Sequence, residues 1–269
     1  MKKLLKKYIL WTYGIFYCFF LLIGMTMLVL KADTLAEILK IVSAWTSTFV
    51  FIAMFRKIYP KDSLIHYIKR QFSERVKIST VLCAILLQLF VFLGSLLFTS
   101  TTQNIPLKAQ VTTSWVTLIA IFGNNLIRGT LGEELGWRGF VLNELQKKYT
   151  PLKSAIIVGV IWGFWHTPIW FTNGYLGLLL LQYIICFMIY IISASIVITT
   201  FYNLNHNLLI PIIIHQLFNC FIDIQTGNLL HKITVTALAY FVVAVILVLV
   251  NYKNSLYGRR TTKLKEVAQ

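Results

Sequence analysis

Acidic side chains are scarce in this sequence. Nine of the 269 residues are aspartate or glutamate, against 25 lysines and arginines, and charged residues make up 13% of the chain. A soluble domain carries about 25% charged residues. Because hydrophobic residues make up 58% and the mean hydropathy is +0.74, the composition excludes an ordinary soluble protein and predicts an integral membrane protein.

Cysteine is also rare, and its pattern excludes a disulfide framework. The four cysteines, Cys18, Cys83, Cys186 and Cys220, lie in apolar runs without a CxxC pair. We interpret them as small core or lipid-facing residues. The sequence also lacks HExxH, the helical motif in which two histidines bind zinc and the glutamate acts as a base.

Long apolar runs dominate the rest of the sequence. A membrane-spanning helix needs about 20 apolar residues. We therefore expect an all-α, polytopic membrane helix bundle of about eight transmembrane helices, which form a single integral membrane domain over residues 1–269. The expected spans are Tyr8–Leu30, Leu35–Phe55, Ile78–Phe98, a fourth that starts near Val111, Ser154–Phe171, Leu176–Phe201, Leu208–Ile222 and Ile233–Val250.

The first apolar run follows a basic N-terminus, as in a signal peptide. It is too long for the apolar region of a signal peptide, which has about 7–15 residues. No convincing small-x-small cleavage site follows it. We therefore expect Tyr8–Leu30 to be retained as a membrane span.

Basic residues cluster at four places and predict the orientation of the spans. With eight spans all four clusters fall on one side, which the positive-inside rule assigns to the cytoplasm. We expect a multi-pass protein of the cell membrane with both termini cytoplasmic. The net charge of +16 then reflects topology and attraction to anionic lipid, not nucleic-acid binding. The clusters are Lys2, Lys3, Lys6 and Lys7; Arg56, Lys57, Lys61, Lys69, Arg70, Arg75 and Lys77; Lys147, Lys148 and Lys153; and Lys253, Arg259, Arg260, Lys263 and Lys265. The segment Lys57–Lys77 fits either an amphipathic helix on the inner leaflet or a solvated loop.

Three of the nine acidic residues, Glu133, Glu134 and Glu144, fall within twelve positions. A carboxylate at membrane depth is costly and usually serves chemistry or transport. On a helix, Glu134 and Arg138 are i,i+4 neighbours that can pair, while Glu133 points about 100° away. One carboxylate is then neutralised and the other stays free. The structural alternative is that these residues mark the wet cytoplasmic end of the fourth helix.

Two later apolar segments carry histidines. His166 lies inside the fifth span, where Pro168 should free a backbone carbonyl and kink the helix. His215 and Asn219 are i,i+4 neighbours and face the same way. They offer hydrogen-bond donors to a developing oxyanion, and the histidine offers a metal ligand. The structural alternative is a set of polar contacts between helices.

The order of these motifs resembles one family. The segments Glu133-Glu134-Leu-Gly-Trp-Arg138, Trp162-Gly-Phe-Trp-His166 and His215-Gln-Leu-Phe-Asn219 resemble the EExxxR, FxxxH and HxxxN motifs of the CPBP family. This family includes type II CAAX prenyl endopeptidases, bacteriocin-processing enzymes and abortive-infection proteins. The resemblance covers a protease core of about residues 111–222. It departs at Trp162, where the family usually has phenylalanine.

The resemblance implies an intramembrane endopeptidase. Its substrate would be a membrane-associated protein or peptide, such as a prenylated CAAX-like protein or a bacteriocin leader. Glu133 and His166 would activate a water molecule, and His215 and Asn219 would stabilise the oxyanion. Arg138 would orient the acid pair.

The supporting acid would be Glu134, and no cofactor is expected. The family's label as metalloproteases keeps zinc possible, with Glu133, His166 and His215 as ligands. Two other functions are a non-proteolytic membrane immunity or scaffold protein and a proton-coupled transporter that uses these three residues as a relay. The intact motifs favour the peptidase over a scaffold, and the lack of repeated halves disfavours a transporter. We expect lipid and a peptide or protein substrate as partners, and the sequence does not specify an oligomeric state.

The depth of the acid pair leads to one further prediction. If the fourth span starts near Val111, Glu133 lies about 33 Å along it, at the cytoplasmic surface, although the histidines lie deeper. We therefore predict that this helix continues through Glu133 and Glu134 to about Gln146. Glu133 would then lie in a water-filled cavity open to the cytoplasm.

Overall fold

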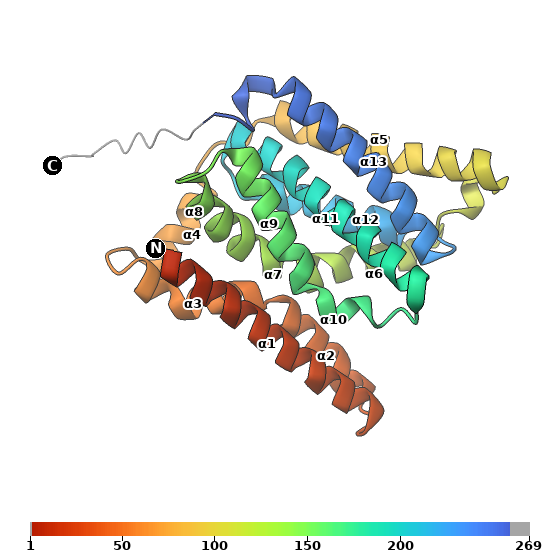
Figure 1. Cartoon of the computed structure of the whole chain (residues 1–269), viewed down its shortest axis with the longest axis horizontal. Coiled ribbons are helices and arrows are strands. Elements are labelled where there is room, and N and C mark those ends of the chain that lie inside the picture. Colours follow the sequence, from red (N-terminus) through yellow and green to blue (C-terminus); the bar gives the residue numbers. More distant parts are fainter. Residues whose placement is uncertain (1, 259–269) are drawn as a thin grey trace.

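The computed structural model describes residues 2–258 and is an all-α bundle (Figure 1). Within these residues, four helices are long and apolar enough to cross a membrane, and a bent pair adds a fifth span if it counts as one. The long helices are α1 (Lys2–Leu28), α5 (Ile78–Gln103), α11 (Gly177–Asn205) and α13 (Leu229–Val250). The predicted all-α class is confirmed, and the count of about eight transmembrane helices stays a prediction.

The eight apolar runs of the sequence fold into helices of unequal length. The second run is the bent pair α2 (Asp33–Ala44) and α3 (Thr46–Ile58), whose axes differ by 50°. The fifth and seventh are α9 (Pro151–Trp165) and α12 (Leu209–Asp223), with 15 residues each. Fifteen residues extend about 22 Å, which is less than the hydrocarbon core of about 30 Å. The short helices are α4 (Leu64–Gln71), α10 (Thr167–Trp170), η1 (Leu107–Ala109) and η4 (Tyr252–Asn254).

The fourth run forms one continuous helical unit that carries the acid pair. Its parts are α6 (Trp115–Asn125), η2 (Leu126–Thr130), α7 (Leu131–Glu134), η3 (Leu135–Leu142) and α8 (Asn143–Gln146). The prediction that this helix passes the glutamates and ends near Gln146 is confirmed. The sequence did not predict that η2 and η3 are π-helical. Such turns are rare in proteins, and those that occur are often found at functional sites.

Backbone carbonyls along this irregular unit accept hydrogen bonds from neighbouring helices. An unpaired buried polar group is costly inside a membrane, so these bonds stabilise a helix whose own ladder is irregular. The donors are Trp45 Nε1 to Ile127 O at 2.8 Å, Ser47 Oγ to Gly132 O at 3.2 Å and Tyr67 Oη to Gly139 O at 2.6 Å.

Close contact between α1, α3 and η3 depends on a glycine. A Cβ at Gly136 would overlap Tyr8 Oη and lie 2.8 Å from Ser47 Oγ. Tyr8 Oη donates to the Ser47 carbonyl at 2.9 Å, and the Tyr8 ring packs edge-on against Phe140, with centroids 5.0 Å apart. The core therefore sits directly beside the acid pair.

The basic connection after α3 contains a short amphipathic helix, α4, which buries Tyr67 and Gln71 against the bundle and exposes Ile65, Lys69 and Arg70. Burial raises the pKa of Tyr59 and of Tyr67, so both phenols remain hydrogen-bond donors. Tyr59 Oη donates to Glu144 Oε1 at 2.5 Å, and Lys147 Nζ also bonds this oxygen at 2.5 Å. Glu144 is thus a structural residue, distinct from the acid pair.

The predicted basic clusters gather at one end of the bundle. The N-terminus, α4 and α8 lie at the left in Figure 1, and the opposite ends of α1 and α5 lie at the right. Arg259, Arg260, Lys263 and Lys265 lie outside the described residues.

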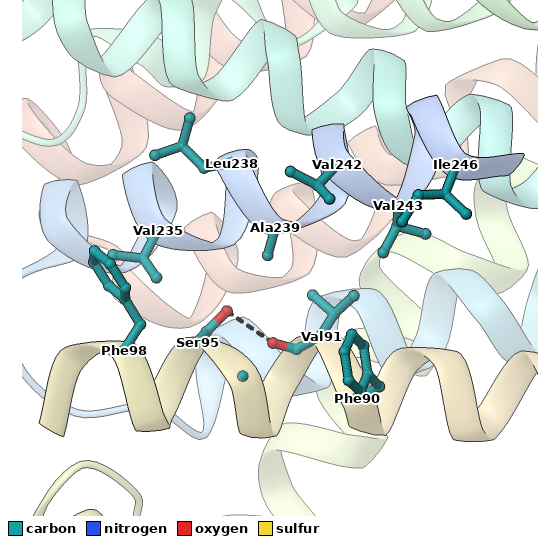
Figure 2. Close-up of a pocket in the computed structure, with 11 residues that line it drawn as sticks. Phe90, Val91, Ser95, Phe98, Val235, Leu238, Ala239, Val242, Val243 and Ile246 are labelled. Atoms are coloured by element: carbon teal, nitrogen blue, oxygen red, sulfur yellow. Dashed lines mark hydrogen bonds between the residues drawn. The ribbon is translucent and has the colours of Figure 1, made fainter. Parts of the chain in front are cut away.

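A groove of about 320 Å³ runs between α5 and α13 (Figure 2). Its walls are apolar or small side chains, and Ser95 Oγ donates to the carbonyl of Val91 at 2.8 Å on its own helix. Neither helix carries a predicted site residue. We interpret this groove as part of the lipid-facing surface.

Candidate active site

Glu134 is the centre of a buried polar network. Its Oε1 accepts hydrogen bonds from Arg138 Nη1 and from His215 Nδ1, both at 2.7 Å. Glu134 and Arg138 have 0% of their surface exposed, and His215 has 2%. The Glu134–Arg138 pair follows the i,i+4 prediction. The bond to His215 was not predicted, because no sequence spacing relates α7 to α12.

The bond to Glu134 also fixes the orientation of the His215 ring. A carboxylate only accepts hydrogen bonds, so the proton of this bond belongs to Nδ1. The other ring nitrogen, Nε2, is directed away from Glu134. It can accept a proton, or donate a hydrogen bond when the ring is doubly protonated.

Glu133 faces a different neighbour, as predicted. Its Oε2 accepts a hydrogen bond from Trp162 Nε1 at 2.5 Å. The Trp162 indole also lies 4.2 Å from Arg138 Cζ and 5.0 Å from the His215 ring centroid. The sequence departs from the family motif at this tryptophan, where phenylalanine is usual. The structure shows that it supplies an N–H donor that phenylalanine lacks.

Three polar groups from two helical units converge on Gly129. A Cβ on this residue would lie 3.2 Å from Asn219 Nδ2, 3.6 Å from Glu133 Oε1 and 4.0 Å from His215 Nε2. The bare Cα of Gly129 therefore opens a small space bounded by an amide donor, a carboxylate oxygen and an imidazole nitrogen. Sequence reasoning missed this glycine, although its position four residues before Glu133 was a usable signal.

His166 lies at the break between α9 and α10. Its Nδ1 hydrogen-bonds the Trp162 carbonyl at 2.8 Å. Pro168 has no N–H to offer the carbonyl of Phe164, which accepts instead from Thr167 Oγ1 at 2.6 Å and Tyr17 Oη at 3.1 Å. The predicted helix break and freed carbonyl are confirmed. His166 is half-buried and more accessible than His215.

Glu133 and His166 line the same cavity, which has a volume of about 600 Å³. Sequence analysis predicted that a cavity at Glu133 opens to the cytoplasm. The observed cavity instead follows the second half of α1 to Leu28 and reaches Thr172 after α10. These residues lie at the end of the bundle away from the basic clusters (Figure 1).

The residues named as possible zinc ligands do not form a metal site in this arrangement. Across residues 2–258, no three His, Cys, Asp or Glu side chains are grouped to hold one ion. The Nδ1 atoms of His166 and His215 have hydrogen-bond partners, so only Nε2 of each ring is left as a possible metal ligand. We derive no step through a metal.

Comparison with known proteins points to one family. Residues 113–221 match the family model described as type II CAAX prenyl endopeptidase Rce1-like. The chain is also similar to CAAX prenyl protease 2 of Methanococcus maripaludis, with 31% identity over 120 residues. This alignment covers 43% of the present chain and 44% of that protein. The chain thus spans less than half the length of the curated relative that it matches. The segment that matches the family model contains all six predicted site residues.

Proposed function

We propose that the chain is an intramembrane endopeptidase of the type II CAAX prenyl endopeptidase (CPBP) family, whose model residues 113–221 match. It would hydrolyse a peptide bond of a membrane-associated protein or peptide, such as a prenylated CAAX-like protein or a bacteriocin leader. The observation that carries this proposal is the convergence of Glu133, His215 and Asn219 on the space at Gly129.

The proposed reaction starts with a water molecule in the space at Gly129. Trp162 engages Glu133 Oε2, which leaves Oε1 to accept a proton from the water as general base. His166 Nε2 orients the same water from the cavity. The hydroxide attacks the carbonyl carbon of the scissile bond, and the carbonyl oxygen becomes an oxyanion.

Asn219 and His215 would stabilise the oxyanion. Asn219 Nδ2 donates one hydrogen bond, and His215 Nε2 donates a second in the doubly protonated form of the ring. Collapse of the intermediate breaks the C–N bond, and Glu133 returns its proton to the leaving amine. The products are a carboxylic acid and an amine, so the reaction consumes one water.

Glu134 and Arg138 have a supporting role in this proposal. Their ion pair is fully buried. Glu134 also accepts a hydrogen bond from the Nδ1–H of His215 and so fixes the orientation of that ring. Residues that hold catalytic groups within a fraction of an ångström preserve the rate without touching the substrate.

We also propose eight membrane-embedded helical units with both termini in the cytoplasm. The short helices α9 and α12 carry site residues and are apolar. His215 lies about 9 Å along the axis of α12 from its first residue. Short helices of this kind can therefore carry a site residue to the site from one membrane surface.

The proposed function is tested with purified protein in lipid vesicles. Candidate substrates are a prenylated CAAX-type peptide and a bacteriocin-leader peptide. The wild-type protein should cleave one of these classes, and His166→Ala should remove cleavage without loss of folded protein. Full cleavage by a well-folded His166→Ala variant would contradict the proposed role of this histidine.

A further inference from the structure

The cavity at Glu133 is lined by two cations that the proposed reaction does not use. Arg128 and Lys40 both contribute to its wall. Arg128 lies in η2, directly before Gly129, and its guanidinium bonds the carboxylate of Glu37 in α2. Lys40 Nζ bonds the same carboxylate at 2.8 Å. The wall of the cavity therefore carries charges that hydrolysis by Glu133 does not require.

The two cations share one anion. Among residues 2–258, Glu37 is the acidic side chain that pairs with both, so the three groups carry one excess positive charge. The side chain of Arg128 is 29% exposed and that of Lys40 is 35% exposed. Because both also line the cavity, a ligand there can reach them. Arg138 differs, since its side chain is 0% exposed and is committed to Glu134.

Two buried donors of the cavity wall make no hydrogen bond. Within residues 2–258, Arg128 Nε and Trp165 Nε1 are buried without a partner, and both side chains line the cavity. An unpaired buried donor is costly. The hydroxyls of Ser43 and Thr172, which also line it, already donate to nearby backbone carbonyls. The unused hydrogen-bonding capacity of these four side chains is thus that of donors, which fits an occupant with acceptor oxygens.

Arg128 lies about one helical turn from Glu133. The segment η2 is π-helical, and the N–H of Leu131 bonds the carbonyl of Leu126, five positions earlier. Residues five positions apart are therefore near neighbours on this surface, about 7 Å apart along the axis. An extended peptide advances about 3.3 Å per residue. A group bound by Arg128 would then lie about two residues from the bond that Glu133 cleaves.

A carboxylate is the acceptor that fits Arg128 best. A guanidinium presents a planar fork of donors that matches the two oxygens of a carboxylate. One carboxylate also balances the single excess charge of the wall, whereas a neutral amide leaves that charge uncompensated. The neutral Nε1–H of Trp165 suits a peptide carbonyl beside it.

We propose that Arg128 is a specificity-determining residue, which binds a carboxylate of the substrate about two residues from the cleaved bond. This carboxylate is either the free carboxyl terminus of the substrate or the side chain of an aspartate or glutamate. Glu37 holds the guanidinium when no substrate is bound, and it competes with the substrate for it. The inference rests on the proposed peptidase function for the cleavage step, but carboxylate binding is measured without cleavage.

Binding is measured with the full chain carrying Glu133→Gln, which lacks the proposed base. The probes are dansyl-labelled peptides of five leucines, one with a free carboxyl terminus and one with a terminal amide. Two further amidated peptides carry glutamate or glutamine as the fourth residue. Fluorescence titration in detergent gives each Kd. The free acid or the glutamate peptide should bind about tenfold more tightly than its neutral partner, as expected for a charge-assisted bond. The peptide that does so identifies the source of the carboxylate, and no preference in either pair would overturn the proposal.

Substitutions in the same background identify the cation. Arg128→Gln should remove the preference, and Lys40→Gln should keep most of it. Arg128→Lys keeps the charge without the planar fork, so it should retain a reduced preference and serves as the second variant if Arg128→Gln does not fold. Loss of the preference in Lys40→Gln, with full preference in the Arg128 variants, would refute the assignment.

Glu37→Gln separates ligand binding from a structural role of the Arg128–Glu37 pair. Because the substitution removes the competing carboxylate, it should strengthen binding of the preferred acidic peptide and leave its neutral partner unchanged. If the pair only ties η2 to α2, Glu37→Gln and Arg128→Gln should weaken the binding of acidic and neutral peptides alike. That result would contradict the proposal.

Cleavage kinetics provide a second readout. For an acidic peptide that the wild type cleaves, Arg128→Gln should raise KM about tenfold and leave kcat within about twofold. An equal fall of kcat for acidic and neutral peptides, with KM unchanged, would show that Arg128 only supports the geometry of the site. If the wild type cleaves no peptide, the peptidase proposal fails, and the binding titrations still decide whether Arg128 binds a carboxylate.

Discussion

The indole N–H of Trp162 donates a 2.5 Å hydrogen bond to Oε2 of Glu133. This bond joins the first two of the three sequence motifs and leaves Glu133 Oε1 directed at the space beside Gly129. The same ring packs against Arg138 and His215. Trp162 is therefore a positioning residue in this chain, as well as an aromatic packing residue.

Replacement Trp162→Phe should remove the N–H donor and keep an aromatic ring at this position. A hydrogen bond to a charged group contributes about 1.5–3 kcal/mol, which corresponds to a loss of roughly 10- to 100-fold in rate. We expect kcat to fall by that factor and KM to stay within twofold. Steady-state kinetics of the two proteins measure both. A kcat equal to that of wild type would show that the indole N–H does not position Glu133 for catalysis.

Replacement Gly129→Ala should fill the space where the proposed water lies. The new methyl group would sit 3.2 Å from Asn219 Nδ2, closer than the usual carbon–nitrogen contact. We expect turnover to fall at least 100-fold while thermal stability changes little. Gly123→Ala is the matched control, because a Cβ there meets nothing within 4 Å. Equal activity of the two variants would place the reacting water elsewhere.

Replacement Arg138→Ala should destabilise the fold. It leaves the buried Glu134 carboxylate without its cation, and breaking a buried ion pair costs about 3–5 kcal/mol. Arg70→Ala removes the Asp62–Arg70 pair, whose arginine is 51% exposed, and should cost about 0–1 kcal/mol. Thermal unfolding in detergent compares the two. Equal midpoints would mean that water or another group compensates Glu134.

Reporter fusions test the proposed topology. Fusions after Lys7 and after Lys265 should both report the cytoplasm, because the basic clusters favour that side. Enzyme reporters that are active on one side of the membrane measure this directly. An external signal from either fusion would refute the arrangement with both termini inside.

Local rules predicted the parts of the site that depend on one helix. The Glu134–Arg138 pair follows from i,i+4 spacing, and the break at His166 follows from the missing N–H of Pro168. The helix of the fourth apolar run was extended correctly to Gln146 because its apolar residues continue past the glutamates. Each prediction needed only chain-local geometry.

Contacts between helices were beyond the reach of the sequence. The bonds from Trp162 to Glu133 and from His215 to Glu134 join residues 29 and 81 positions apart, and no periodicity fixes which nitrogen faces which oxygen. The π-helical turns on both sides of the acid pair also change the angle between successive side chains. The predicted cavity at Glu133 is present, but the sequence did not predict that its wall follows α1 to Leu28.

The central claim is that Glu133 acts as the base of a peptide hydrolysis within the membrane. The most direct measurement is the cleavage rate of a candidate peptide by wild-type protein and by Glu133→Ala in lipid vesicles, each with and without a strong chelator. We predict cleavage by wild type that is insensitive to the chelator, and loss of cleavage in a Glu133→Ala variant that unfolds at the wild-type temperature. Wild-type turnover by a well-folded Glu133→Ala variant would contradict the account. Loss of activity on chelation, restored by zinc, would instead require a metal-bound water in place of the one assigned to Glu133.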